Sequence, residues 1–226
     1  MTLSIIMPVL NEALEIETAL RALTPLRQRD VEIIVVDGGS SDGTAELARP
    51  FADRVLASPR GRSLQMNAGA AAARGDMLLF LHADTRLPEN ADRFVLDGLA
   101  TSGRAWGRFD VRFDRGAVFA VIALLMNLRS RLSGIATGDQ AMFVSRTAFA
   151  AAGGFPPIAL MEDVALSTNL KRIGRPLCLA ARVTTSTRRW RKHGVLRTIL
   201  LMWKLRLAFF FGADPTRLAQ SYASGR

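Results

Sequence analysis

Two mainly apolar runs that each end in an aspartate constrain most strongly how this chain can fold. Residues 77–81 read Met-Leu-Leu-Phe-Leu and lead through His82 into Asp84, and residues 31–36 read Val-Glu-Ile-Ile-Val-Val and lead into Asp37. An apolar run without regular alternation is typical of a strand that is covered on both faces, as in a parallel sheet. Ligands of such sheets bind outside the carboxyl ends of the strands, so both aspartates are expected to face a crevice.

A third strand is expected near the start of the chain, over residues 3–7. It is predicted to stop at Pro8, because proline has no amide hydrogen to donate to a sheet ladder, and to lead into Asn11 and Glu12. Helical patterns separate the three strands. This alternation predicts an α/β fold with a mainly parallel central sheet flanked by helices.

The loop after the second strand, residues 38–44, reads Gly-Gly-Ser-Ser-Asp-Gly-Thr, and Asp42 or Thr44 is expected to cap a helix that begins at Ala45. The chain lacks the glycine-rich turn of dinucleotide-binding proteins after its first strand, and it lacks a phosphate-binding P-loop. Backbone amides are therefore not expected to hold most of the phosphate charge of a nucleotide. A divalent cation, Mn²⁺ or Mg²⁺, bound by a carboxylate such as Asp84 is the alternative.

A further acidic pair, Glu162 and Asp163, follows a Gly-Gly-Phe-Pro-Pro turn and opens a helical pattern over residues 164–172. The two carboxylates could favour the positive end of that helix. One of them could instead act as a general base. The residues alone leave both interpretations open.

The length of 226 residues indicates one medium domain, or one domain with an appendage. A single cysteine, Cys178, excludes a disulfide within the chain and agrees with a reducing compartment. We expect no signal peptide and no transmembrane segment, and hence a cytoplasmic protein. The apolar stretch 117–126 is too short to span a bilayer and predicts a core or interfacial helix.

The end of the chain is strongly basic. From Lys171 onward there are thirteen Lys and Arg residues against one acid, Asp214, and they alternate with apolar residues that include Trp203 and Phe209–Phe211. Such a segment is typical of an element on an anionic membrane surface. A helix packed on the core with a solvated basic face would give the same pattern. Nucleic-acid binding is not predicted, because no motif of a nucleic-acid-binding fold is present.

Taken together, four motifs resemble those of family 2 glycosyltransferases with the GT-A fold, over roughly residues 3–175. They are Ser4–Glu12, Val35–Thr44, Leu79–Asp84 and Gly153–Asp163. More narrowly, three segments resemble a small bacterial branch of this family with a Phe-Leu-His-Ala-Asp-Thr motif, some members of which are associated with carotenoid glycosylation. These segments are Phe80–Pro88, Gly138–Gln140 and Arg188–Trp190.

The resemblance implies a role for each matched residue. Asp84 would hold the divalent cation, with His193 as a further ligand, and Asp163 of the Glu162–Asp163 pair would be the catalytic base. The residues expected near the acceptor or the donor sugar are Gly138, Asp139 and Gln140. The residues expected to bind the nucleotide, with the two arginines on its diphosphate, are Pro8, Asn11, Glu12, Asp37, His82, Asp84, Arg188 and Arg189.

Two positions depart from the family pattern. His82 stands where the metal-binding motif usually has its first acid, and a neutral imidazole supplies no negative charge. Gly38 stands where a second acid usually follows the second strand. We therefore expect altered metal affinity at the first position and looser recognition of the base at the second.

The implied activity is metal-dependent transfer of a sugar from a nucleotide-diphosphate sugar to an acceptor hydroxyl, with inversion, on a lipid-like acceptor such as a carotenoid. Residues 1–185 would form the GT-A domain, with a nucleotide-binding half (1–100) and an acceptor half (101–185), and residues 186–226 the basic tail. Two alternatives are a sugar-phosphate nucleotidyltransferase, which normally has a glycine-rich loop after its first strand, and a non-catalytic membrane-binding protein. The latter would explain the tail but not the acids at the strand ends.

Overall fold

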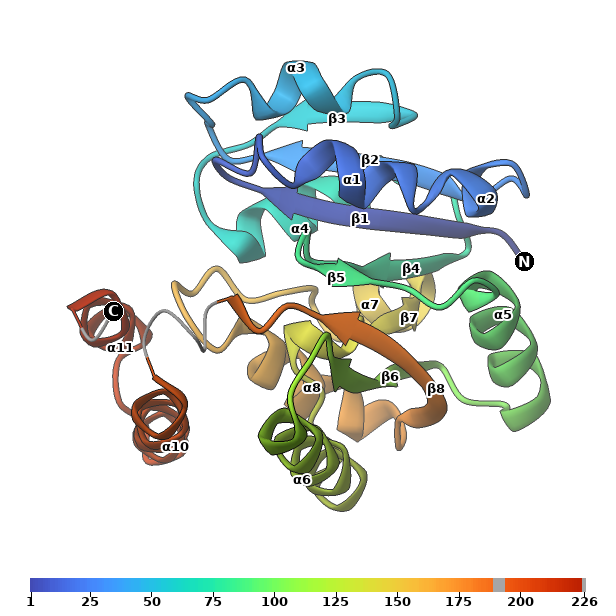
Figure 1. Cartoon of the computed structure of the whole chain (residues 1–226). Helices are drawn as coiled ribbons and strands as arrows, with labels where there is room; N and C mark the ends of the chain where they lie inside the picture. The colour runs from blue at the N-terminus through green and yellow to red at the C-terminus, as the bar shows by residue number, and fades with distance from the viewer. Residues whose placement is uncertain (189–193, 225–226) are drawn as a thin grey trace.

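The computed structural model describes residues 1–188 and 194–224 of the chain. In this part of the chain one 8-stranded sheet, of order β3-β2-β1-β4-β7-β6-β8-β5, has helices on both faces (Figure 1). The strands are β1 (Leu3–Val9), β2 (Glu32–Asp37), β3 (Arg54–Ala57), β4 (Met77–Phe80), β5 (Thr85–Arg86), β6 (Trp106–Phe113), β7 (Phe143–Ser145) and β8 (Leu177–Thr185). The helices are α1 (Ile16–Arg21), α2 (Thr24–Arg27), α3 (Thr44–Ala48), α4 (Arg62–Ala72), α5 (Ala91–Ser102), α6 (Ala117–Ser133), the 3-10 helix η1 (Gly138–Gln140), α7 (Arg146–Ala151), α8 (Glu162–Ile173), α10 (Val195–Phe210) and α11 (Pro215–Ser224).

The three expected strands are β1, β2 and β4, and they lie side by side. β1 is parallel to both of its neighbours, with Ser4 opposite Glu32 in β2 and Leu3 opposite Met77 in β4. β3 extends this part in parallel. The other half of the sheet is mixed, because β7 is antiparallel to β4 and β6, whereas β6 and β8 are parallel. The predicted α/β fold is confirmed, and the parallel arrangement is concentrated in the first half.

The expectation that the first strand stops at Pro8 is wrong, since β1 continues to Val9 and pairs there with Asp37 of β2. The physical reason lies in which way the backbone of Pro8 faces. The carbonyl of Ile6 accepts a hydrogen bond from Leu81 on the β4 side, and Pro8, two residues later, faces the same side. The pairing of β1 with β4 ends at Ile6, so the missing amide hydrogen of Pro8 removes no bond from the ladder.

The sheet separates two hydrophobic cores. Leu3, Ile5 and Met7 of β1 belong to a core with α1, α2 and α5, whereas Ile6 belongs to a second core with α4, α7 and α8. Alternate residues of a strand point to opposite faces, so β1 contributes to both cores. This double covering explains why the strand segments are apolar on both faces.

The order β2-β1-β4 places the ends of β1 and β4 where the direction of chain progression across the sheet reverses. Parallel α/β sheets bind ligands at such a point, outside the carboxyl ends of the strands. Glu12 follows β1, Asp37 ends β2 and Asp84 follows β4, so the three acids lie at the same edge.

The tail forms a pair of helices, α10 and α11, beside the sheet (Figure 1). Leu205 of α10 and Leu218 of α11 are buried in a small cluster with Met161, which precedes α8. The opposite side of α10 exposes Leu196, Leu200, Trp203, Leu207 and Phe210, each by 61% or more. α10 is therefore packed on the protein through Leu205, and its solvated side carries apolar residues together with the basic residues Arg197 and Lys204.

The apolar stretch 117–126 forms the first part of α6, which buries Ala123, Asn127 and Ser130 and exposes Val121, Leu124 and Leu128. It is thus a surface helix with an apolar outer side. Within residues 1–188 and 194–224, no helix is long and apolar enough to cross a membrane.

Candidate active site

The loops that follow β1 and β2 hold each other in place. Asn11 adopts the left-handed conformation, with φ of 53°, and its side-chain oxygen accepts a hydrogen bond from the amide of Ser41 at 2.9 Å. The amide of Glu12 donates to the hydroxyl of Thr44 at 2.9 Å, and Asp42 accepts from the amide of Thr44 at 3.1 Å. Asn11 thus shapes the loop that carries Glu12.

Asp37 is buried, and its carboxylate accepts hydrogen bonds from the amides of Gly39 at 3.0 Å and Ser40 at 2.9 Å. A side chain at Gly38 would come within 3.0 Å of the Gln65 amide group. Gln65 donates to the carbonyls of Val9 and Val36, both at 2.8 Å, and so joins the ends of β1 and β2. A larger residue at position 38 would therefore crowd the side chain of Gln65, which occupies the space beside Gly38.

A cavity of about 360 Å³ lies outside the ends of β1 and β4. It brings together four of the residues expected to bind the nucleotide, which are Pro8, Glu12, His82 and Asp84. Arg60 and Arg62, which the sequence analysis missed, also line it. The signal that could have found them is a Pro-Arg-Gly-Arg turn following an edge strand of the parallel part. The cavity therefore combines carboxylates with guanidinium groups.

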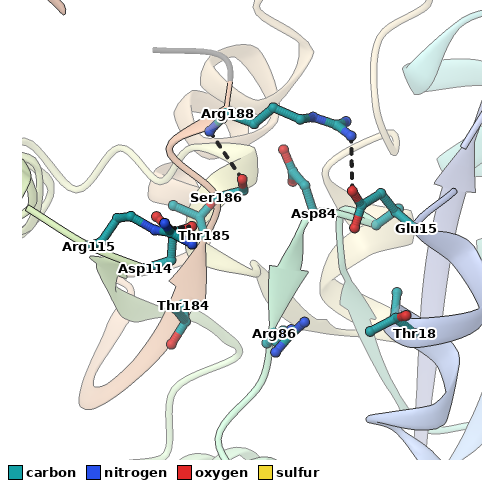
Figure 2. A pocket seen from close by; sticks show the side chains of 12 residues that line it. Glu15, Thr18, Asp84, Arg86, Asp114, Arg115, Thr184, Thr185, Ser186 and Arg188 are labelled. Atoms are coloured by element: carbon teal, nitrogen blue, oxygen red, sulfur yellow. Dashed lines mark hydrogen bonds and ion pairs between the residues drawn. The ribbon is translucent and has the colours of Figure 1, made fainter. Parts of the chain in front are cut away.

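Asp84 also borders a second cavity of about 360 Å³, on the side of α1 and β8 (Figure 2). There Arg188 reaches past Asp84 toward Glu15, and its guanidinium nitrogens lie 3.1 Å from Oε1 of Glu15 and 3.5 Å from Oε2 of Glu12. Arg188 therefore lies beside Asp84, as a diphosphate contact would require, but it is paired with two acids. Arg189 and His193 lie outside the described residues.

The electrostatics around Asp84 suit a cation. Burial raises the pKa of Glu12, Arg188 lowers it, and the charge of Asp84 raises it again. Two carboxylates that repel each other beside a cavity can supply oxygen ligands to a hard divalent cation. Such a cation often binds one or two carboxylates and completes its coordination shell with substrate phosphate and water. In the described ranges no group of three His, Cys, Asp or Glu side chains is arranged to hold a metal ion.

The residues expected near the acceptor meet the end of β4 through η1. The Asp163 carboxylate accepts hydrogen bonds from the amides of Gly138 at 2.8 Å and Val164 at 2.7 Å. Nδ1 of His82 lies 3.8 Å from Oδ1 of Asp139. A side chain at Gly138 would come within 2.3 Å of the His82 ring, so glycine is required for this close approach. The end of β4, η1 and the start of α8 thus form one continuous site.

The two acids of the Glu162–Asp163 pair differ. Glu162 is buried, with 5% of its surface exposed, and burial raises its pKa, followed by the charge of Asp163. The Asp163 side chain is held by amides on either side of the gap between η1 and α8. Asp163 is therefore the acid whose carboxylate is oriented by backbone amides, whereas Glu162 is enclosed in the protein.

The structure places Gln140, which we expected near the acceptor or the donor sugar, inside its own turn. Gln140 is fully buried, and its side chain caps η1 through Thr137 and contacts Asn127 at 3.5 Å. Gln140 thereby stiffens the turn that presents Gly138 and Asp139.

Comparison with known proteins identifies the family. The family model described as Glycosyl transferase family 2 matches residues 4–147, which is more than half of the chain. The chain belongs to glycosyl transferase family 2. A probable glycosyltransferase of Bacillus subtilis (strain 168), YdaM, is 26% identical over 196 residues, which cover 76% of this chain and 47% of the relative. The succinoglycan biosynthesis protein ExoA of Rhizobium meliloti (strain 1021) is 36% identical over 107 residues, which cover 43% of this chain and 32% of the relative.

Solved structures share the fold, which is the GT-A fold of this family. The mannosyltransferase PcManGT from Pyrobaculum calidifontis, in complex with GDP-Man and Mn²⁺, aligns with a TM-score of 0.67 at 19% identity, over 99% of this chain and 69% of that one. TarS of S. aureus, in complex with UDP, aligns with a TM-score of 0.68 at 18% identity, over 82% and 60%. The chain spans less than half of the length of YdaM and ExoA.

Proposed function

We propose that the protein transfers a sugar from a nucleoside-diphosphate sugar to an acceptor hydroxyl. The observation that carries this proposal is the cavity outside β1 and β4, where Glu12 and Asp84 meet Arg60 and Arg62. Asp163 is joined to the same site through η1. Neighbours of the same fold in complex with GDP-Man and Mn²⁺ or with UDP-GlcNAc support this donor class.

In this proposal Asp84, with Glu12 beside it, holds a divalent cation, Mn²⁺ or Mg²⁺. When bound, the cation supplies positive charge that stabilises the departing nucleoside diphosphate. Arg60 and Arg62 line the same cavity and add positive charge there. Arg188 is proposed to exchange its pairing with Glu12 and Glu15 for a diphosphate oxygen, since a guanidinium binds phosphate with two parallel hydrogen bonds.

Asp163 is proposed to accept the proton of the acceptor hydroxyl. The amides of Gly138 and Val164 fix the orientation of its carboxylate, so the base is positioned before the acceptor arrives. Attack by the deprotonated oxygen on the face of the anomeric carbon opposite the diphosphate would invert its configuration. In this proposal the acceptor approaches past Gly138 and Asp139, and Nδ1 of His82 lies 3.8 Å from Oδ1 of Asp139.

We further propose that the protein rests on an anionic membrane surface, where a lipid-like acceptor would be found. Residues 116–119, at the start of α6, and residues 194–197, at the start of α10, line one apolar hollow of about 650 Å³, so the two helices begin next to each other. Both expose apolar side chains, and α10 also exposes Arg197 and Lys204. Apolar burial together with basic side chains is the combination that binds interfacial helices to anionic lipids. The location that goes with this proposal is the cytoplasmic face of the cell membrane.

The proposal keeps residues 1–185 as the catalytic domain, with a nucleotide-binding half (1–100) and an acceptor half (101–185), and residues 186–226 as the membrane-facing tail. Strands from both halves pair directly, since β4 is bonded to β7. A nucleotidyltransferase is disfavoured, because residues 8–12 after β1 form no glycine-rich loop. Family membership disfavours a non-catalytic role.

A thermal-shift screen of sugar nucleotides, with and without Mn²⁺, tests the donor class. We expect one group of nucleoside-diphosphate sugars to raise the melting temperature only when Mn²⁺ is present, since ligand that binds only the folded state stabilises it. Equal stabilisation with and without Mn²⁺, or none from any sugar nucleotide, would contradict the proposal.

The Asp163→Asn variant tests the base. It should bind the donor as the wild type does but transfer sugar roughly 10²–10⁴-fold more slowly, the range found for general acid–base groups. Titration with the donor and release of nucleoside diphosphate measure the two effects separately. Asp97→Asn, on the exposed side of α5, is the matched control. Turnover near that of the wild type would leave Asp163 as a helix-capping residue only.

A further inference from the structure

Two arginines beside the acid pair have buried nitrogen atoms without partners. They are Nε and Nη2 of Arg129 on α6 and Nε of Arg206 on α10. These nitrogens are shielded from solvent and donate no hydrogen bond within the described part of the chain. A charged group that leaves water without hydrogen bonds is costly to bury. Arg108 also has a buried Nε without a partner among the described residues, but its Nη1 pairs with Asp110. Neither Arg129 nor Arg206 forms an ion pair within residues 1–188 and 194–224.

The two guanidinium groups lie close to each other and to the proposed base. The pKa of Arg129 is lowered to about 10, first by burial and then by the charge of Arg206, while Asp163 and Asp139 act in the opposite direction. Burial also lowers the pKa of Arg206, and the same two acids oppose this effect. The two positive charges therefore repel each other in the neighbourhood of Asp163.

The packing of both helices fixes this arrangement. Asn127 of α6 exchanges hydrogen bonds with the backbone of Val111 in β6, at 2.9 and 3.0 Å, and thereby holds the turn that carries Arg129. Leu205 of α10 is buried against Met161, immediately before Glu162, so α10 packs beside the start of α8. The arginines thus come from helices far apart in the sequence, and the charge of Asp163 acts on both.

We propose that Arg129 and Arg206 bind an oxyanion, a phosphate or phosphate-ester group, that the acceptor carries near the hydroxyl attacked by Asp163. Guanidinium groups bind phosphate oxygens through paired N–H donors, and the phosphate charge would relieve the repulsion between the two cations. The inference rests on the proposed function. The acceptor is the favoured source, because neither arginine lines the two cavities around Asp84, where the donor phosphates are proposed to bind.

Binding of inorganic phosphate to the full chain tests the site by calorimetry, with saturating UDP and Mn²⁺ present or absent. We expect phosphate to bind in both conditions, and Arg129→Met and Arg206→Met to weaken this binding by about tenfold or more, the loss of a hydrogen bond to a charged group. Arg197→Met, exposed on the same helix as Arg206, is the matched control and should bind phosphate as the wild type does. A short-chain phosphatidic acid in place of phosphate shows whether the oxyanion is better recognised on a lipid.

Stability provides a second readout. Removal of an unpaired buried cation should leave the free protein folded and raise its melting temperature, whereas a purely structural arginine would lower it. Three results would overturn the inference. They are no phosphate binding by the wild type, phosphate binding by both Met variants as tight as that of the wild type, and loss of phosphate binding when UDP and Mn²⁺ are present. The last would assign the arginines to the donor. Failure of UDP itself to bind with Mn²⁺ would count against the proposed function and not against this site.

Discussion

At the start of α8, the adjacent carboxylates of Glu162 and Asp163 differ in burial, since Glu162 is buried and Asp163 is only partly buried. Burial and the charge of Asp163 raise the pKa of Glu162 above its usual value near 4.5. The folded protein therefore holds a proton on Glu162 at pH values where the unfolded chain has released it. Between the two pKa values folding takes up a proton, so stability is present below about 4.5 and is lost as the pH rises through the folded pKa.

The Glu162→Gln variant removes this pH dependence. We expect its melting temperature, relative to that of the wild type, to rise progressively between pH 4 and pH 8, because the amide stays neutral throughout. Melting curves across this range measure the effect, and Glu46→Gln, exposed on α3, is the control that should follow the wild type. A constant difference between Glu162→Gln and wild type at all pH values would contradict the assigned environment.

The sequence predicted the acidic residues of the site better than the arginines. Asp37 and Asp84 could be placed at one edge because parallel strands present their carboxyl ends together. The placement of Arg60 and Arg62 depends on where α4 begins, that of Arg129 on the packing of α6 on β6, and that of Arg206 on the packing of α10 against Met161. No local pattern encodes those contacts. The burial of Gln140 in its own turn was not predicted, because burial of a polar side chain leaves no mark on the sequence.

At the scale of elements, the close packing of α4 on the sheet depends on Gly69. A side chain there would lie 2.4 Å from Cγ2 of Ile6 in β1 and 3.0 Å from Cγ2 of Val36 in β2. Both partners belong to strands and cannot move away independently. The helix that carries Gln65, and that begins at Arg62, is thereby pressed onto the strands whose ends form the cavity.

We expect Gly69→Ala to destabilise the protein by about 1–3 kcal/mol, the usual cost of overpacking, although alanine is the better helix former. Urea unfolding measures the change. Gly174→Ala, which would place its methyl group in open space, is the matched control. If Gly69→Ala proves as stable as the control, α4 does not pack on β1 as closely as described.

The strands β1, β2 and β4 were predictable from their apolar runs, whereas β6, β7 and β8 were not predicted. Which side of each helix faces solvent was not predictable either. The stretch 117–126 and the basic tail both read as amphipathic helices, and amphipathic residues can face the core, a partner or a membrane with the same spacing. The exposed apolar sides of α6 and α10 were decided by tertiary contacts, above all the burial of Leu205 and Ser130 on their inner sides.

At the scale of the whole molecule, the apolar sides of α6 and α10 predict membrane binding. The protein should float with anionic vesicles and less with neutral ones, and less at high salt, since each Lys or Arg near an anionic surface contributes on the order of 1 kcal/mol. Trp203→Ser should reduce the part of the binding that salt does not remove. Phe94→Ser, which removes an aromatic ring that is 43% exposed on α5, is the control. Equal recovery with both vesicle types, or none with either, would contradict membrane docking.

The central claim is that Asp84 holds the cation through which a nucleoside diphosphate binds outside β1 and β4. Calorimetric titration of the full chain with UDP and with GDP, each with and without Mn²⁺, tests it most directly. We predict that one nucleotide binds the wild type and Asp97→Asn tightly only with Mn²⁺, and that Asp84→Asn, still folded, loses this Mn²⁺-dependent binding. Undiminished Mn²⁺-dependent affinity in folded Asp84→Asn would contradict the account.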